Sequence, residues 1–210
     1  MIMTRYAKEF VGIAKTEIEK AKNIYPPEMW NTDKYAKTGN CTCHPRTLGL
    51  LVKSMWMMKD VEAVDVDVRL GQGVRGDSKK KILKPDVAGL RSDGDYLLLV
   101  DFESPSSMDD WIPFKDVGAF VRWAGELQHI GSKNVPEYLV VTSLPSKEGW
   151  KQHWRWGGKE APEGMNTYAY WYEYYGQIIN KEFRDWRRFP IRFANFDGNH
   201  LSLVSSDLRT

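Results

Sequence analysis

Three acidic side chains, Asp86, Asp101 and Glu103, have types and a spacing that suit the binding of a divalent cation. Asp101 and Glu103 follow an apolar run, Leu97–Val100, and in a strand their i, i+2 spacing puts both carboxylates on one face. Asp86 lies near the start of the preceding predicted strand, and the intervening Ser92–Asp95 is typical of a hairpin turn. Because the start of one hairpin strand lies opposite the end of the next, Asp86 is predicted to face the other two acids.

Carboxylates brought together in this way suit phosphodiester hydrolysis. That reaction needs hard cations that neutralise the scissile phosphate and lower the pKa of an attacking water. Magnesium prefers such oxygen ligands, so Mg²⁺ or Mn²⁺ is the expected cofactor. The acids also end a strand that otherwise looks buried, where charges are costly unless they are paired or bound to metal. The alternative is that they lie in solvent at the strand end.

The elements that must position these acids are read from apolar periodicity. The predicted helices cover residues 5–24, 46–59 and 113–130, and the predicted strands cover residues 64–70, 83–90, 96–103, 138–142, 191–196 and 201–204. The strand over 96–103 is the most apolar, so it is expected at the centre of the sheet. The order predicts a mixed α/β fold, in which an antiparallel meander passes through a crossover helix into a further strand.

The acids and their surroundings resemble a known family. Pro85-Asp86, a hairpin, and then Asp101-Phe102-Glu103 resemble the PD-(D/E)xK nuclease superfamily, which includes many type II restriction enzymes. The resemblance covers residues 45–143 and implies a restriction endonuclease-like fold, a mixed central sheet flanked by helices. It also implies that Asp86 and Asp101 bind Mg²⁺ together with the main-chain carbonyl of Phe102.

The chain departs from the family pattern at Glu103, where the usual residue is lysine. Some restriction enzymes of the superfamily have a glutamate there, which acts as a base or a metal ligand. In others the lysine comes from elsewhere in the fold, and Lys115 is the candidate for that catalytic role. Two alternatives stay open: Lys115 belongs to a solvated helix face, or the change marks a relative that does not cleave.

The resemblance further implies a metal-binding glutamate on the first helix. Glu17 falls inside the apolar stripe of the helix over 5–24, whereas Glu9 and Glu19 fall outside it. An acid on a buried stripe requires a partner, and a metal ion and a salt bridge are both candidates for Glu17.

Basic residues could contact a nucleic-acid backbone. The net charge is only +2, so such contact must come from local clusters rather than from a global field. The candidates lie before the Asp86 strand and among the C-terminal aromatic residues: Lys79, Lys80, Lys81, Lys84, Arg155, Arg187 and Arg188. The alternatives are a solvated turn for the lysines, and tryptophans that pack in a core while the arginines extend to water.

Length and composition define the class of protein. The 210 residues, 42% hydrophobic and 28% charged, are expected to form one domain over 1–210, with a core at 45–143 and an aromatic and basic extension at 144–210. No apolar run approaches the ~18 residues that span a membrane. The start of the chain lacks the apolar region of a signal peptide. The whole sequence has only two cysteines. We therefore expect a reducing cytoplasm.

The combined expectation is a Mg²⁺-dependent endonuclease that hydrolyses DNA, with RNA not excluded as a substrate. Cleavage of both strands of a duplex would favour a homodimer, since one site per strand is the simple geometry. One alternative is a nuclease fold without catalysis that serves as a DNA-binding or assembly subunit. Another is an interaction protein in which the acids form ion pairs.

Overall fold

The structure is a computed structural model that describes residues 5–22, 43–71, 82–103, 112–129, 134–143, 188–196 and 201–203. The helices are α1 (Arg5–Lys22), α3 (Cys43–Trp56) and α4 (Ile112–His129). The strands are β1 (Ala63–Val66), β2 (Val87–Leu90), β3 (Tyr96–Glu103), β4 (Glu137–Ser143), β5 (Ile191–Phe196) and β6 (Leu201–Leu203). Most of these bounds lie within a few residues of those predicted from periodicity.

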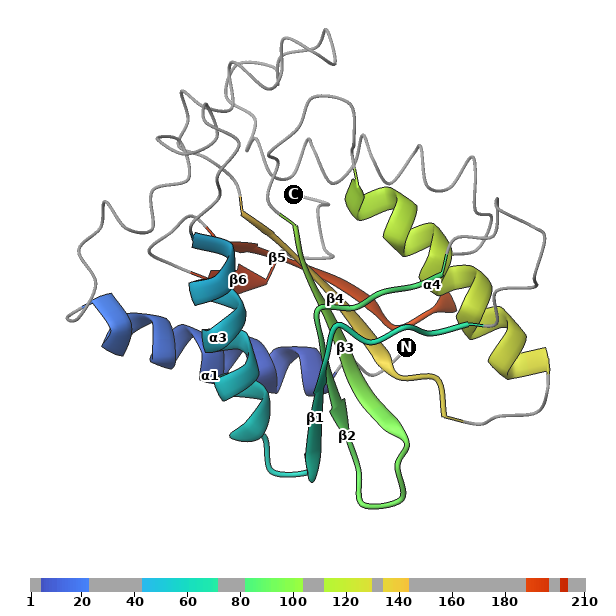
Figure 1. Cartoon of the computed structure of the whole chain (residues 1–210), viewed down its shortest axis with the longest axis horizontal. Coiled ribbons are helices and arrows are strands. Elements are labelled where there is room, and N and C mark those ends of the chain that lie inside the picture. The colour runs from blue at the N-terminus through green and yellow to red at the C-terminus, as the bar shows by residue number, and fades with distance from the viewer. Residues whose placement is uncertain are drawn as a thin grey trace, which may run out of the picture.

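The described strands form one six-stranded sheet in the order β1-β2-β3-β4-β5-β6 (Figure 1). The pairs β1–β2 and β2–β3 are antiparallel, whereas β3–β4 is parallel and is connected through α4. The pair β4–β5 is parallel, and β5–β6 is antiparallel. The predicted mixed α/β class, the meander, the crossover helix and the central place of β3 are therefore confirmed.

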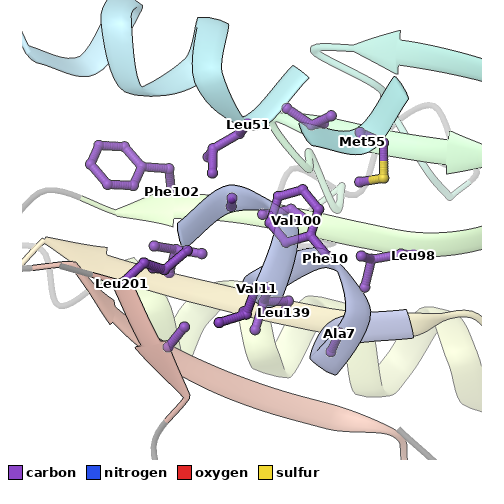
Figure 2. Packing of buried hydrophobic residues seen from close by; sticks show 14 of the residues in the cluster. Ala7, Phe10, Val11, Leu51, Met55, Leu98, Val100, Phe102, Leu139 and Leu201 are labelled. Atoms are coloured by element: carbon purple, nitrogen blue, oxygen red, sulfur yellow. The ribbon is translucent and has the colours of Figure 1, made fainter. Parts of the chain in front are cut away.

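The sheet separates two layers of helices. Helices α1 and α3 cover one face and α4 covers the other (Figure 1). The α1–α3 cluster includes Phe10, Leu51, Leu98, Val100 and Phe102 (Figure 2). The α4 cluster includes Leu99, Phe120, Tyr138, Val140 and Phe193. Successive residues of a strand point to opposite faces, so β3 contributes alternately to both clusters and is buried on both sides.

The first two strands are shorter than predicted. The sequence favoured strands over 64–70 and 83–90, whereas β1 and β2 have four residues each. At Asp67 the backbone has a φ of 54°, in the left-handed region, which ends the extended run. Pro85 has no N–H to give to a ladder. The Asp67 N–H still donates to the carbonyl of Asp86 at 3.1 Å, so the irregular segment stays beside the start of β2.

The N-terminus of α1 is held by a residue distant in the sequence. Its first turn has no acidic residue. Instead, the Glu137 carboxylate accepts hydrogen bonds from the Tyr6 N–H at 2.9 Å and the Ala7 N–H at 2.7 Å. Burial raises the pKa of Glu137, and these N–H groups oppose that rise by favouring the charged form. The contact fixes α1 to the first residue of β4.

Parts of the predicted C-terminal extension belong to the central sheet. Strands β5 and β6 come from the region 144–210 and extend the sheet beyond β4. Most of the aromatic stretch between β4 and β5 lies outside the described residues. Among the helices that the structure describes, none combines the length and the apolarity that crossing a membrane requires.

The close approach of α3 to β2 gives a test of this packing. A Cβ added at Gly89 would lie 2.7 Å from the Met55 Sδ and 3.0 Å from the Val61 Cγ2, and Met55 is fully buried. We expect Gly89→Ala to lower the free energy of unfolding by about 1–3 kcal/mol, as overpacked cores do.

The matched control is Gly12→Ala on the exposed side of α1, where a Cβ would meet nothing within 4 Å. That variant should gain roughly 0.5–1 kcal/mol, since alanine is the better helix former. Urea denaturation of both variants measures the difference, and a Gly89→Ala protein as stable as Gly12→Ala would contradict the close packing of α3 on β2.

Candidate functional site

Asp86 and Asp101 meet at the end of the hairpin formed by β2 and β3. The antiparallel register pairs Val87 with Val100, so these two acids occupy the next positions along the strands. The Asp86 N–H donates to the Asp101 Oδ1 at 3.2 Å, and the Phe102 N–H donates to the Asp86 Oδ2 at 2.7 Å. We call this reciprocal pair of hydrogen bonds the Asp86–Asp101 clamp. The predicted juxtaposition of the two acids is thus present in the structure.

The Asp101 side chain is buried, with 3% of its surface exposed, whereas Asp86 is half-buried. Asp101 lies on the face of β3 that α4 covers, because its neighbour Phe102 packs in the α1–α3 cluster. A buried carboxylate needs hydrogen-bond donors. The hydroxyl of Tyr138 on β4 donates to the Asp101 Oδ2, while the clamp supplies a donor to Oδ1.

Tyr138 is the site residue that the sequence interpretation missed. Its ring is fully buried and stacks on Phe120 of α4, with centroids 4.6 Å apart and planes 13° from parallel. Buried tyrosines usually bond their hydroxyl to a partner. A tyrosine at the start of the otherwise aliphatic strand Leu139–Val141 is the signal in the sequence that could have found it.

The Phe102 carbonyl points toward the same edge of β3 as Asp86. In an extended strand the N–H and C=O of one residue point to the same edge. Because the Phe102 N–H donates to Asp86, its carbonyl also points toward the edge of β3 where Asp86 lies. Two carboxylates and one carbonyl are the hard oxygen donors that Mg²⁺ accepts, with water completing its shell. The donor set therefore fits the expected cofactor.

Two further predicted catalytic residues are described only by their backbones. Glu103 is the last residue of β3 and pairs with Thr142 of β4, and Lys115 lies in the first turn of α4. The side chains of both residues lie outside the described part of the structure. Among the described side chains, no group of three or more His, Cys, Asp or Glu residues is arranged to hold a metal ion. The roles of Glu103 and Lys115 stay predictions.

Glu17 has lysine partners. Its carboxylate is 2% exposed, so its predicted burial is confirmed. The Lys20 Nζ lies 2.7 Å from Oε1, and the Lys53 Nζ of α3 lies 2.5 Å from Oε2. Glu17 sits with α1 and α3, whereas Asp101 faces α4 across the sheet. Of the two partners predicted for Glu17, these contacts are the salt bridge. The two lysines compensate the charge of the Glu17 carboxylate without a metal ion.

The basic candidates for nucleic-acid contact are described in part. Lys84 is exposed and precedes the clamp by two residues, and Arg188 is exposed just before β5. The others lie outside the described residues: Lys79, Lys80, Lys81, Arg155 and Arg187.

Comparisons of the chain with protein-family models, with curated proteins and with solved structures found no match. The geometry around the Asp86–Asp101 clamp therefore carries the functional interpretation.

The Glu17 ion pairs predict a pH dependence of stability. The hydrogen bond from Lys20, followed by that from Lys53, lowers the pKa of Glu17 below its ordinary value of 4.5. The ionised form thus stabilises the fold above pH 4.5, and this contribution is lost as the pH falls through the lowered pKa. We expect Glu17→Gln to cost roughly 1 kcal/mol or less near neutral pH, since both lysine heads are exposed and screened.

Urea denaturation of the Glu17→Gln protein and the parent at two pH values tests this. The difference in unfolding free energy should shrink as the pH falls below 4.5. The control is Glu126→Gln, an exposed glutamate of α4, for which we expect little change at either pH. A Glu17→Gln difference that grows in acid would contradict the ion pairs.

Proposed function

We propose that the protein is a Mg²⁺-dependent endonuclease that hydrolyses DNA phosphodiester bonds, with a restriction endonuclease-like arrangement of its core. The observation that supports this best is the Asp86–Asp101 clamp, in which each carboxylate accepts a backbone N–H from the opposite side of the hairpin. The order α3-β1-β2-β3-α4-β4 supports it as well, because it agrees with the core that the family resemblance implies.

The chemistry divides among a few groups. A bound Mg²⁺ would neutralise charge on the scissile phosphate and lower the pKa of an attacking water. Asp86, Asp101 and the Phe102 carbonyl would hold the ion. Glu103 would bind the ion or orient the water, and Lys115 would stabilise the negative charge that develops on the phosphate.

The burial of Asp101 favours this use of its charge. The α4 cluster keeps water from one side of the carboxylate, and electrostatic interactions strengthen where water is excluded. Asp86 is only half-buried, so the pair has one protected acid and one that solvent reaches. A cation bound between them would be attracted more strongly on the buried side, at Asp101. It could enter from the solvent on the side of Asp86.

Asp86→Asn tests the proposal most sharply. Asparagine retains a side-chain oxygen for the Phe102 N–H, so the clamp can persist while the charge is lost. With supercoiled plasmid and Mg²⁺, we expect nicking or linearisation by the parent protein and at least about a hundredfold less by the variant, because metal contacts supply several kcal/mol to the transition state. EDTA should abolish the activity.

The matched control is Asp93→Asn in the hairpin turn, where an exposed aspartate accepts the Asp95 N–H at 3.0 Å. Asp93→Asn removes one negative charge from the same hairpin, and this variant should cleave plasmid like the parent. Cleavage by Asp86→Asn at the parent rate, or parent cleavage that persists in EDTA, would refute the metal-dependent nuclease.

One observation favours a second function, that of a non-cleaving DNA-binding or assembly subunit. Both Asp101 oxygens accept hydrogen bonds from the protein, so the buried acid is compensated without a metal. The change from lysine to Glu103 in the family pattern agrees with this alternative. DNA binding by the parent protein, without turnover in Mg²⁺ or Mn²⁺, would identify it.

Nucleic-acid contact near the site can be tested through Lys84. Its exposed position two residues before Asp86 suits a contact to a phosphate. We expect Lys84→Gln to reduce the slope of log affinity against log salt by about 1 on DNA, since each neutralised phosphate contributes about 0.9. The control is Lys59→Gln, another exposed lysine, which follows α3. Equal slopes for the parent and both variants would exclude Lys84 from the contact.

RNA as a substrate and the homodimer stay predictions, to be tested with RNA in the cleavage assay and by sedimentation.

A further inference from the structure

The two oxygens of the Asp101 carboxylate have different donors. Oδ2 accepts the hydrogen bond of the buried Tyr138 hydroxyl. Oδ1 accepts the Asp86 N–H at 3.2 Å, which places Oδ1 on the side where Asp86 lies. A carboxylate oxygen has two acceptor sites, so one oxygen can accept a hydrogen bond and also bind a cation. The two oxygens are therefore not equivalent toward an ion that Asp86 shares.

The position of the Tyr138 hydroxyl is fixed by packing. The ring is fully buried and stacks on Phe120, which in turn meets Phe189 edge-on at 6.4 Å. The backbone is held as well, since the Tyr138 N–H donates to the Pro190 carbonyl at 2.9 Å. In the parallel register Tyr138 pairs with Leu99, two residues before Asp101 on the same face of β3, and the ring spans that step. The hydroxyl cannot follow the carboxylate if the latter rotates.

We propose that Tyr138 is a positioning residue that makes Asp101 bind a divalent cation through Oδ1 alone and thereby favours Mg²⁺ over Ca²⁺ at this site. The inference rests on the proposed function, because it requires that Asp86 and Asp101 hold a divalent cation. Calcium accepts both oxygens of one carboxylate and takes 6–8 ligands in flexible geometry. Magnesium requires a near-octahedral shell at shorter distances, which single-oxygen ligands and water satisfy.

Chelation of an ion by both Asp101 oxygens would disturb the contact with Tyr138. The carboxylate would have to turn, and the hydroxyl would be left in the α4 cluster without its acceptor. A buried polar group without a partner is unfavourable, so the parent protein resists the two-oxygen mode. Without the hydroxyl, binding through both oxygens no longer leaves a buried donor unpaired. The hydrogen bond that fixes the orientation of the Asp101 carboxylate is lost as well.

Calorimetric titration of the full chain with MgCl₂ and with CaCl₂, without DNA, tests the inference. For Tyr138→Phe we expect Mg²⁺ affinity to fall roughly 10–100-fold, the usual effect of losing a group that orients a metal ligand. Calcium affinity should fall less or rise, so the ratio of the two affinities moves toward Ca²⁺. Tyr96→Phe is the matched control, since Tyr96 packs against the same cluster at the far end of β3 and should leave the ratio unchanged.

Each outcome separates this inference from the proposed function. If Tyr138→Phe lowers the affinities for both ions equally, or changes neither, the role of Tyr138 is overturned. The nuclease proposal is still supported in that case if Mg²⁺ binding depends on Asp86. Parent protein that binds neither ion, or binds them without Asp86, would overturn both. If Tyr138→Phe does not fold, as judged by near-UV circular dichroism, Phe120→Leu replaces it. That variant keeps the hydroxyl but removes the ring on which Tyr138 stacks. An unchanged ratio of Mg²⁺ to Ca²⁺ affinity in it would overturn the inference.

Discussion

Strand β3 is buried on both faces, and this constraint determines the character of the candidate site. Leu98, Val100 and Phe102 pack toward α1 and α3, while Leu99 packs toward α4. Strict alternation along the strand then directs Asp101 into the layer under α4. An acid in that layer must have hydrogen-bond donors. They come from both sides of β3: the Asp86 N–H, just before β2, and the Tyr138 hydroxyl on β4.

Three described acids are buried, and they differ in the groups that surround them. Glu137 accepts N–H groups at the start of α1, and Glu17 pairs with two lysines, so each of these acids joins elements distant in the sequence. Asp101 differs because a second carboxylate, that of Asp86, lies beside it. Two like charges in one place are unfavourable unless a cation or a proton is shared. This arrangement is what the proposed cation site rests on.

The crossover through α4 connects the sheet to the site. It returns the chain so that β4 runs parallel to β3, with Val140 opposite Asp101. The same helix supplies Phe120, which holds the Tyr138 ring. The first turn of α4 carries Lys115, so one element both supports the acid and carries a predicted catalytic cation. Changes in the packing of α4 would therefore reach Asp101 through the Tyr138 ring.

The sequence by itself determined the strands, the helices and the facing of Asp86 toward Asp101, because two-residue periodicity and a hairpin turn are local properties of the chain. It misjudged the length of the first strands, since the left-handed backbone of Asp67 has no strong signal in a strand pattern. Only the tertiary structure decided that Glu17 pairs with lysines and that Tyr138 reaches Asp101. Those partners come from other elements, and periodicity shows that a side chain is buried without showing which donor it meets.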